Sequence, residues 1–165
     1  MAERQAHPIA PVFDEMSRIL ILGSFPSVKS REAGFFYGHP QNRFWRVLAA
    51  VLGCPVPVTI DEKRDMLLAH HVAVWDVIAS CEITGSSDSS IRNVVPTDLG
   101  RILAAAPISA IFCNGGTALR LYQKYQQNST GIPAAGLPST SPANAAWTLN
   151  RLVSVWNVIR TELEK

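Results

Sequence analysis

An unbroken aliphatic run, Ile19 to Leu22, leads directly into the turn-forming sequence Gly23-Ser24-Phe25-Pro26-Ser27. A strand with one face in water alternates apolar and polar residues, whereas this run has no polar position. It therefore predicts a strand that is buried on both faces, which is typical of a parallel sheet. This strand constrains the fold strongly, because a parallel sheet needs helices packed on both of its faces.

The succession of strand, turn and helix continues along the chain. Further strands are expected at His71–Val77, Ile108–Cys113 and Ile132–Leu137. Helices are expected at residues 42–52, 61–70, 97–106 and 118–126, followed by a last helix with Ser141 as its N-cap and Pro142 in its first turn. Residues 24–41 show no period and residues 82–90 are polar, so both are expected to be loops. This alternation predicts a single α/β domain over residues 1–165, with a parallel sheet between two layers of helices.

The composition excludes several classes of protein. With 47% hydrophobic and only 17% charged residues, the chain is not intrinsically disordered. The net charge of +2 does not by itself nominate a nucleic-acid binder, so an argument from charge has to be local. Cys54, Cys81 and Cys113 lack metal-ligand spacing and are expected to be buried thiols in a reducing compartment. The sequence suggests neither a signal peptide nor a membrane span, so we expect a soluble, cytoplasmic protein.

Ligands of parallel sheets bind at the carboxyl ends of the strands. Those ends are expected at Gly23–Ser27, Asp76–Ser80, Asn114–Thr117 and Leu137–Asn144. A carboxylate at Asp76 is suited to accept the N–H of a base or to act on a water molecule; the alternative is a helix-capping aspartate. The sequence Asn114-Gly115-Gly116 suits either a ligand cradle or a tight strand-to-helix turn.

The densest group of functional side chains is Gly38-His39-Pro40-Gln41-Asn42-Arg43-Phe44-Trp45. Its aromatic residues, with Tyr37 beside them, are suited to stacking on a base, and its amides to positioning a water or reading a base edge. Lys29, Arg31, Arg43 and Arg46 add a local basic patch. The structural alternative is that Asn42 caps the next helix and that the aromatic residues belong to the core.

A second group is Leu137-Pro138-Ser139-Thr140-Ser141-Pro142-Ala143-Asn144, within a stretch from Tyr125 to Asn150 that holds no charged residue. A neutral loop rich in Ser and Thr ahead of a helix is suited to phosphate contacts through hydroxyl and backbone N–H groups. The alternative is a capped loop below the core.

Together these strings resemble the uracil-DNA glycosylase superfamily. The resemblance rests on Gly23-x-x-Pro26 at the end of the first strand and on Pro138-Ser139-x-Ser141 before the last helix, and it extends from about Ile9 to Ile159. The longer strings Ile-Leu-Gly-Ser-Phe-Pro-Ser and Phe-Tyr-Gly-His-Pro-Gln-Asn-Arg-Phe-Trp are similar to its hypoxanthine-DNA glycosylase branch. The resemblance implies a three-layer α/β/α sandwich with a central four-stranded parallel sheet.

The chain also departs from other branches of that superfamily. Ser24 and Phe25 stand where the uracil-specific branches carry a polar Asp or Asn, and Leu137 stands where the best-known branch has a catalytic His. The resemblance therefore implies that Asn42 is the catalytic residue that orients water, with Asp76 as the second candidate. The iron–sulfur cysteines of some branches are absent, so neither a metal nor a cofactor is implied.

The implied activity is hydrolysis of the N-glycosidic bond of a flipped deaminated base, chiefly hypoxanthine in deoxyinosine, which leaves an abasic site. No lysine stands in the motif clusters, so lyase chemistry is not expected, and the partner is DNA that carries a deaminated base, bound by a monomer. The residues expected to bind the base are Gly23, Ser24, Phe25, Pro26, Tyr37, His39 and Asn114. Those expected to bind DNA are Ser27, Lys29, Arg43, Ser139, Thr140, Ser141 and Asn144, with the loop 140–144 filling the space that the base leaves.

Three other functions are compatible with the residues alone. The first is a glycosylase for uracil or for mismatched bases, and the second is a hydrolase of free nucleosides. The third is a doubly wound nucleotide-binding module without chemistry.

Overall fold

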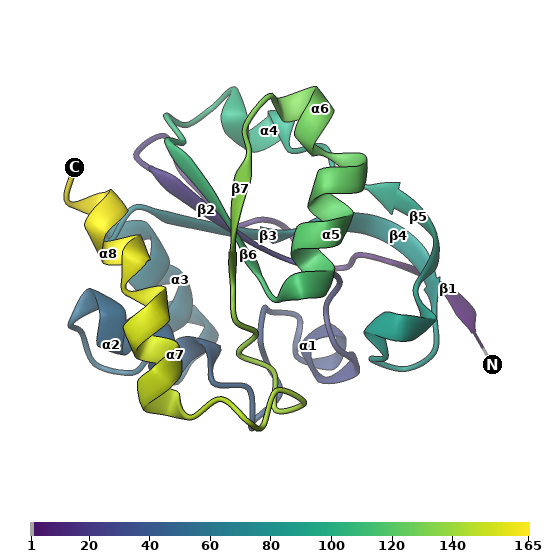
Figure 1. Ribbon diagram of the computed structural model, residues 1–165, viewed down its shortest axis with the longest axis horizontal. Helices are drawn as coiled ribbons and strands as arrows, with labels where there is room; N and C mark the ends of the chain where they lie inside the picture. Colours follow the sequence, from purple (N-terminus) through teal and green to yellow (C-terminus); the bar gives the residue numbers. More distant parts are fainter. Residues whose placement is uncertain (1) are drawn as a thin grey trace.

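The computed structural model describes residues 2–165 and has a four-stranded parallel sheet at its centre (Figure 1). The strands are β2 (Ile19–Gly23), β3 (Val72–Asp76), β6 (Ala110–Asn114) and β7 (Ala134–Leu137), in the spatial order β3-β2-β6-β7. All five residues of β2 and all five of β3 are buried, as their continuous apolar runs predict. The predicted parallel sheet is confirmed.

Helices cover both faces of this sheet, which gives the three-layer α/β/α arrangement (Figure 1). One layer holds α2 (Phe44–Leu52), α3 (Ile60–Ala69), α7 (Leu149–Trp156) and α8 (Val158–Leu163), of which α3 contacts β3 and α8 contacts β2. The other face carries α5 (Gly116–Tyr125), which packs on β6 and β7, together with α4 (Gly100–Leu103) and α6 (Gln127–Thr130). The apolar face expected for the first of these helices is confirmed, because Phe44, Val47, Leu48 and Val51 are all buried.

A second, antiparallel sheet was not predicted. It consists of β1 (Glu3–Ala6), β4 (Ile78–Ile83) and β5 (Arg92–Pro96) in the order β1-β4-β5, with the short 3-10 helix η1 (Asp88–Ser90) before β5. Polar residues interrupt the apolar positions of β4 and β5, so neither strand shows the continuous run that marked the parallel sheet. Backbone pairing with β1 brings the N-terminal segment beside the end of β3.

The expected start of the last helix is wrong. Residues 141–148 form turns, and the helix begins at Leu149 with Thr148 as its N-cap, whose Oγ1 accepts a hydrogen bond from Arg151 N. The backbone carbonyls of Ser141 and Asn144 accept hydrogen bonds from Asn144 N and Trp147 N within these turns, and also from the Arg43 guanidinium. A distant side chain therefore braces this loop.

Two further local expectations are corrected. The segment expected to be irregular at residues 24–41 contains α1 (Val28–Ala33), which Ser27 caps through a hydrogen bond from Ser30 N to its Oγ. The helix expected from Thr97-Asp98 to Ala106 is reduced to α4, where Asp98 Oδ1 accepts a hydrogen bond from Gly100 N but Thr97 makes no cap. The Thr97 hydroxyl instead donates to the carbonyl oxygens of Asp76 and Val77.

The described chain contains no helix that is both long and apolar enough to cross a membrane. Within residues 2–165, no group of three or more His, Cys, Asp or Glu side chains is placed to hold a metal ion. All three cysteines are free thiols: Cys81 and Cys113 are buried as expected, whereas Cys54 is only partly buried.

Candidate active site

A cavity of about 390 Å³ lies where the four parallel strands end. Register places Gly23 beside Asp76 and Asn114 beside Leu137, so the segments after the strands meet at one edge of the sheet. The lining residues are Gly23, Ser24, Phe25, Pro26, Ser27, Ser30, Phe36, Tyr37, His39, Asn42, Asp76, Ser86, Asp88, Asn114, Ser139, Thr140, Ser141, Pro142 and Ala143. Every site residue predicted from the sequence is among them except Lys29, Arg43 and Asn144.

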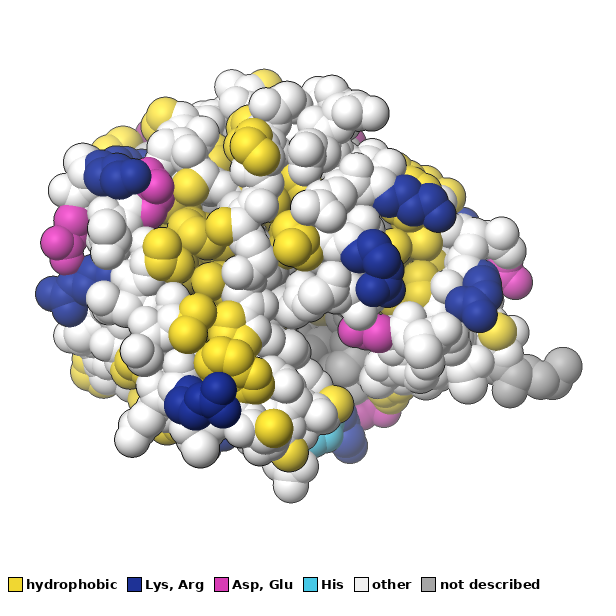
Figure 2. All heavy atoms as spheres, viewed as in Figure 1, with side chains coloured by type: hydrophobic (Ala, Val, Ile, Leu, Met, Phe, Trp, Pro, Cys, Tyr) yellow, Lys and Arg dark blue, Asp and Glu magenta, His cyan; other side chains and the backbone are white. Residues whose placement is uncertain are grey.

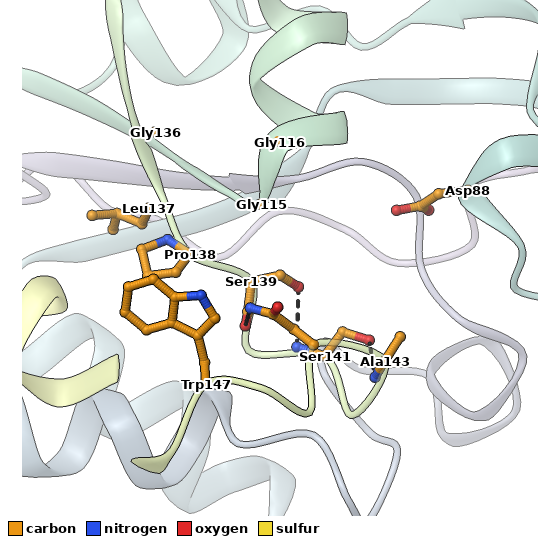
Figure 3. A pocket seen from close by; sticks show the side chains of 11 residues that line it. Asp88, Gly115, Gly116, Gly136, Leu137, Pro138, Ser139, Ser141, Ala143 and Trp147 are labelled. Carbon is orange, nitrogen blue, oxygen red and sulfur yellow. Dashed lines mark hydrogen bonds between the residues drawn. The ribbon is translucent and has the colours of Figure 1, made fainter. Parts of the chain in front are cut away.

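A shallower groove of about 620 Å³ adjoins this cavity and shares Asp88, Ser139 and Ser141 with it. Figure 3 shows the groove between the start of α5 and the loop after β7, with Trp147 at one end and Asp88 across from Ser139. Asn144 lines this groove. Figure 2 shows the hollowed side of the molecule, where Lys and Arg side chains are scattered and uncharged atoms dominate.

The orientation of the Asn42 amide is fixed by two donors. Asn42 Oδ1 accepts hydrogen bonds from Phe44 N at 2.9 Å and from Thr140 Oγ1 at 2.8 Å. A backbone N–H can only donate, so the atom that faces Phe44 must be the amide oxygen. Both lone pairs of Oδ1 are thereby engaged, while Nδ2 has no partner in residues 2–165. Asn42 is half-buried and lines the cavity, to which it offers a hydrogen-bond donor.

Thr140 connects Asn42 to the end of β6. Its hydroxyl accepts a hydrogen bond from Asn114 Nδ2 at 3.0 Å, and its backbone N–H donates to Asn114 Oδ1 at 3.1 Å. Thr140 is completely buried, so these bonds are shielded from water. The Asn114 amide is therefore held by Thr140, and the predicted base-binding asparagine serves first as a support for the loop.

Asp76 forms a buried pair with His7, a residue that no sequence motif had singled out. His7 Nε2 and Asp76 Oδ2 lie 2.7 Å apart, and only 4% and 5% of the two side chains are exposed. Because His7 Nδ1 accepts a hydrogen bond from Ile9 N at 3.1 Å, the ring proton is on Nε2, which donates to Asp76. The other carboxylate oxygen, Oδ1, has no hydrogen-bond partner in the described chain.

Gly23 makes room for that carboxylate. A Cβ atom placed on Gly23 would lie 2.4 Å from Asp76 Oδ1 and 3.0 Å from the hydroxyl of Tyr37. The first distance is far inside van der Waals contact, so only glycine fits at this position without displacing Asp76. The glycine of the Gly-x-x-Pro motif is thus required by a side chain on the neighbouring strand.

Aromatic side chains form the walls around these polar groups. Tyr37 stacks on Phe44 with ring centroids 3.9 Å apart, and its backbone has the left-handed φ of 52°. The Tyr37 hydroxyl is buried without a hydrogen-bond partner, and burial, together with the nearby Asp76 carboxylate, raises its pKa. Phe25, on another wall, has only 8% of its surface exposed. A phenol that stays protonated keeps its proton available for donation.

The Arg43 guanidinium is occupied by the loop after β7. It donates to the backbone carbonyls of Trp147, Ser141 and Asn144, and the Arg43 backbone N–H donates to Thr140 O at 3.1 Å. Charge-assisted hydrogen bonds of this kind are stronger than neutral ones. Arg43 thus fixes the loop 140–147 against the start of α2 and does not line the cavity.

The expected basic patch is only partly free. Arg31 donates to the carbonyls of Pro26 and Gly85 and lies over the Phe25 ring, so it braces the cavity wall. Lys29 is exposed and lies 3.9 Å from Glu32, a loose surface pair that water and salt weaken. Arg46 is also exposed. Two of the four cations therefore hold loops rather than facing solvent.

Sequence reasoning missed His7, Phe36 and Asp88. Phe36 and Asp88 line the cavity, and the carboxylate of Asp88 accepts a hydrogen bond from Ser24 Oγ at 3.2 Å. The surrounding loops raise the pKa of Asp88 by limiting its hydration, and the bond from Ser24 partly offsets this. His7 had no recognisable signal in the sequence. It lies 69 positions from Asp76 and is brought beside it by the pairing of β1 with β4.

Fold and cavity together define an α/β enzyme with its site at the carboxyl edge of a parallel sheet. Comparison with known proteins identifies the class. Residues 10–160 match the sequence model of the Uracil DNA glycosylase superfamily. A protein of Methanosarcina acetivorans named hypoxanthine DNA glycosylase is 32% identical over 149 residues, which are 90% of this chain and 93% of that protein. A protein of the same name from Methanosarcina barkeri is 34% identical over 92 residues, 55% of this chain and 57% of its own length.

A solved structure agrees with these matches. The solution NMR structure of a candidate uracil DNA glycosylase from Methanosarcina acetivorans superimposes with a TM-score of 0.81 at 31% identity, covering 95% of this chain and 97% of that one. The chain belongs to the uracil DNA glycosylase superfamily. Its enzyme class is therefore DNA glycosylase, which hydrolyses N-glycosyl bonds of DNA.

Proposed function

We propose that this protein is a monofunctional glycosylase that releases a deaminated base, chiefly hypoxanthine from deoxyinosine in DNA, and that it acts as a monomer of a single domain. The observation that carries the proposal is a donor and an acceptor without partners in the described cavity, Asn42 Nδ2 and Asp76 Oδ1, beside the Tyr37 hydroxyl, which also has no partner there. The two relatives named hypoxanthine DNA glycosylase support the choice of base.

Asn42 is proposed to hold the attacking water. Its Nδ2–H donates to the water oxygen, which keeps a lone pair for attack on the sugar carbon C1′. The new C1′–O bond forms as the C1′–N bond breaks, the bonding electrons leave with the base, and the proton lost by water ends on the released base. The sugar passes through an oxocarbenium-like state that the flanking phosphates of DNA stabilise. An amide that positions water is sufficient for this role, without a strong general base.

Asp76 is proposed to read the base. An ionised carboxylate can only accept hydrogen bonds. Oδ1 is therefore suited to bind a base that has a ring N–H, and it repels a base whose ring nitrogen carries a lone pair. Deamination converts the ring nitrogen of adenine, an acceptor, into the N1–H of hypoxanthine, a donor. The flipped base would lie against Phe25, which forms an apolar wall of the cavity.

The residues around the cavity support hydrolysis without lyase chemistry. None of the lining residues in the described chain is a lysine, so no amine is placed to form a Schiff base with the sugar. Ser27, Ser139 and Ser141 are proposed to contact the backbone of DNA at the rim, with Lys29 as an outer phosphate contact.

The proposal is tested with duplexes that carry hypoxanthine, uracil or xanthine at one position, under single-turnover conditions. We expect release of free hypoxanthine and an alkali-labile abasic site, with the strand intact before alkali. Release of uracil in preference to hypoxanthine would replace the proposed substrate. Absence of release from every duplex, with an Asn42→Ala variant indistinguishable from the wild type, would reject it.

A further inference from the structure

His7, the buried partner of Asp76, has no role in the proposed chemistry. His7 is not among the residues that line the cavity, yet its side chain is 96% buried directly behind Asp76, as its 4% exposure shows. Its ring lies among Phe25, Phe36 and Trp75, with ring centroids 5.8, 6.0 and 6.4 Å away. Two of these aromatic residues, Phe25 and Phe36, are cavity walls, so His7 belongs to the second layer of the site.

The backbone fixes His7 in this place. Pairing of β1 with β4 sets Ala6 opposite Ser80, and His7 N donates to Ala79 O at 2.7 Å. The Asp76 backbone is held from its other side, where the Thr97 hydroxyl donates to Asp76 O at 2.8 Å. The backbones of both residues of the pair are therefore held by neighbouring elements.

The donor of His7 is directed at one oxygen only. Ile9 N occupies Nδ1, so Nε2–H is the single ring donor and it points at Asp76 Oδ2. Gly23 leaves space beside Oδ1, whereas any Cβ there would meet that oxygen at 2.4 Å. The carboxylate therefore cannot rotate without losing the bond from His7, and Oδ1 keeps its place beside Gly23.

We propose that His7 is a positioning residue that fixes Asp76 so that the cavity presents an acceptor, which makes the enzyme selective for bases with a ring N–H next to a carbonyl. This inference rests on the proposed function, because it names the chemical class of base that the same site takes. The class is the lactam edge, which deamination creates in hypoxanthine and uracil and which guanine and thymine also carry, whereas bases with a ring-nitrogen lone pair at this edge, adenine and cytosine, are disfavoured.

The test separates the donor of His7 from its bulk. In His7→Gln the amide nitrogen replaces Nε2 and keeps the donor, whereas in His7→Asn it replaces Nδ1 and cannot reach Asp76. We expect His7→Asn to slow hypoxanthine release by roughly 10- to 100-fold, the effect of losing a hydrogen bond to a charged group. His7→Gln should retain most of the rate, and His70→Asn, which changes a histidine outside the cavity, should behave as the wild type. In an Asp76→Ala background, His7→Asn should have no additional effect, because His7 acts through Asp76.

A binding experiment makes the test independent of catalysis. Duplexes with a 2′-fluoroarabino sugar resist cleavage, and we compare the affinities of one carrying hypoxanthine and one carrying adenine. The wild type should prefer hypoxanthine, and His7→Asn should lose that preference while binding abasic-site DNA as before. In Asp76→Asn, the His7 donor should hold the amide oxygen and turn the amide N–H₂ toward the base, so the preference should shift toward adenine.

Each outcome decides one of the two proposals. The role of His7 is overturned if Asp76→Asn keeps the wild-type preference, or if His7→Asn retains both the rate and the preference. The Asp76→Asn result decides the question even if the His7 variants do not fold, because His7 is intact in that variant. If the wild type prefers hypoxanthine and His7→Asn loses the preference, but no base is ever released, the positioning role stands and the glycosylase proposal fails.

Discussion

The hydroxyl of Thr140 donates to Asn42 Oδ1 at 2.8 Å across 98 positions of sequence. This bond and those of Arg43 join the two motif clusters, the polar string before α2 and the serine-rich loop after β7. Because the same hydroxyl accepts a hydrogen bond from Asn114, the three side chains form a continuous chain from the end of β6 to the cavity. The orientation of the Asn42 amide thus depends on Thr140, a residue without a proposed role in the reaction itself.

Replacing Thr140 by valine should damage both stability and activity. Valine has the same shape but leaves Asn42 Oδ1 and Asn114 Nδ2 short of a partner in a buried place, at a cost of about 1–3 kcal/mol. We expect a lower midpoint of chemical denaturation and slower release of base in single-turnover assays. Thr140→Ser keeps the hydroxyl and should restore most of the rate; equal rates for the valine and serine variants would show that the hydroxyl is not needed.

Asn42 should be essential for the rate, and because its Oδ1 accepts from Phe44 N and from the buried Thr140 hydroxyl, its loss should also lower the stability. Asn42→Ala is expected to slow base release by about 10²-fold or more, the usual effect of removing a positioned catalytic group. Asn42→Asp sharpens the interpretation, because it keeps an oxygen for Phe44 N and Thr140 Oγ1 but replaces the N–H donor that faces the cavity.

If Asn42 works as a donor to water, the aspartate variant should be impaired as strongly as the alanine variant. An aspartate variant as fast as the wild type would instead assign the residue an acceptor role toward water. Gln41→Ala, at the exposed neighbouring position, serves as the matched control and should leave the rate unchanged.

Arg43→Lys should loosen the loop 140–147 without removing a phosphate contact. A lysine ammonium has three N–H donors but lacks the planar fork of the guanidinium, so it should not reach the three carbonyls that Arg43 holds, and we expect faster amide hydrogen exchange in the loop and weaker binding of DNA. Because lysine keeps the positive charge, the slope of log Kd against log salt concentration is compared for Arg43→Gln, where it should stay the same as in the wild type, since no ion pair with DNA is lost. A slope smaller by about one would show that Arg43 contacts a phosphate after all.

Lys29→Ala should give the opposite pattern. Its side chain is exposed and only loosely paired with Glu32, so it is free to approach a phosphate. We expect the salt slope to fall by about one, with thermal stability and loop exchange unchanged. An unaltered slope would remove Lys29 from the DNA-contacting surface.

Gly23→Ala should disable the site through Asp76. The added methyl group would lie 2.4 Å from Asp76 Oδ1, so the carboxylate or the end of β2 must shift. We expect loss of base release and a lower melting temperature, with a destabilisation of about 1–3 kcal/mol as for other overpacked positions. Gly116→Ala is the matched control, because no atom lies within 4 Å of its added Cβ, and its melting temperature should not fall.

Elements with a continuous apolar signal were predictable from the sequence. The run Ile19–Leu22 and the apolar face of α2 gave correct predictions, since burial on both faces or on one helical face leaves a pattern that neighbours in sequence reveal. The antiparallel strands β4 and β5 were missed because β5 has no buried residue and the buried positions of β4 follow no regular alternation, so neither strand leaves a continuous apolar run. The last helix was placed too early because Ser141-Pro142 has the composition of a helix start.

The location of the cavity followed from the sequence by a general rule. Strands of a parallel sheet end at one edge, so the polar residues after β2, β3, β6 and β7 had to meet there. The rule brought together Asp76, Asn114 and Thr140, and the polar string before α2 added Asn42, without specifying which atom of each would face the cavity. The same string predicted Arg43 as a contact to DNA, which stays a prediction, and its guanidinium holds the loop after β7.

The sequence by itself determined the α/β class, the parallel sheet and the set of polar residues at its edge, because these depend on periodicity and on chain order. Only the tertiary structure decided the direction of the Asn42 amide, the pairing of His7 with Asp76 and the need for Gly23. These are set by hydrogen bonds and close contacts between residues distant in sequence, Asn42 with Thr140 and His7 with Asp76. Such contacts leave no periodic pattern, since each depends on where the folded backbone places two individual side chains.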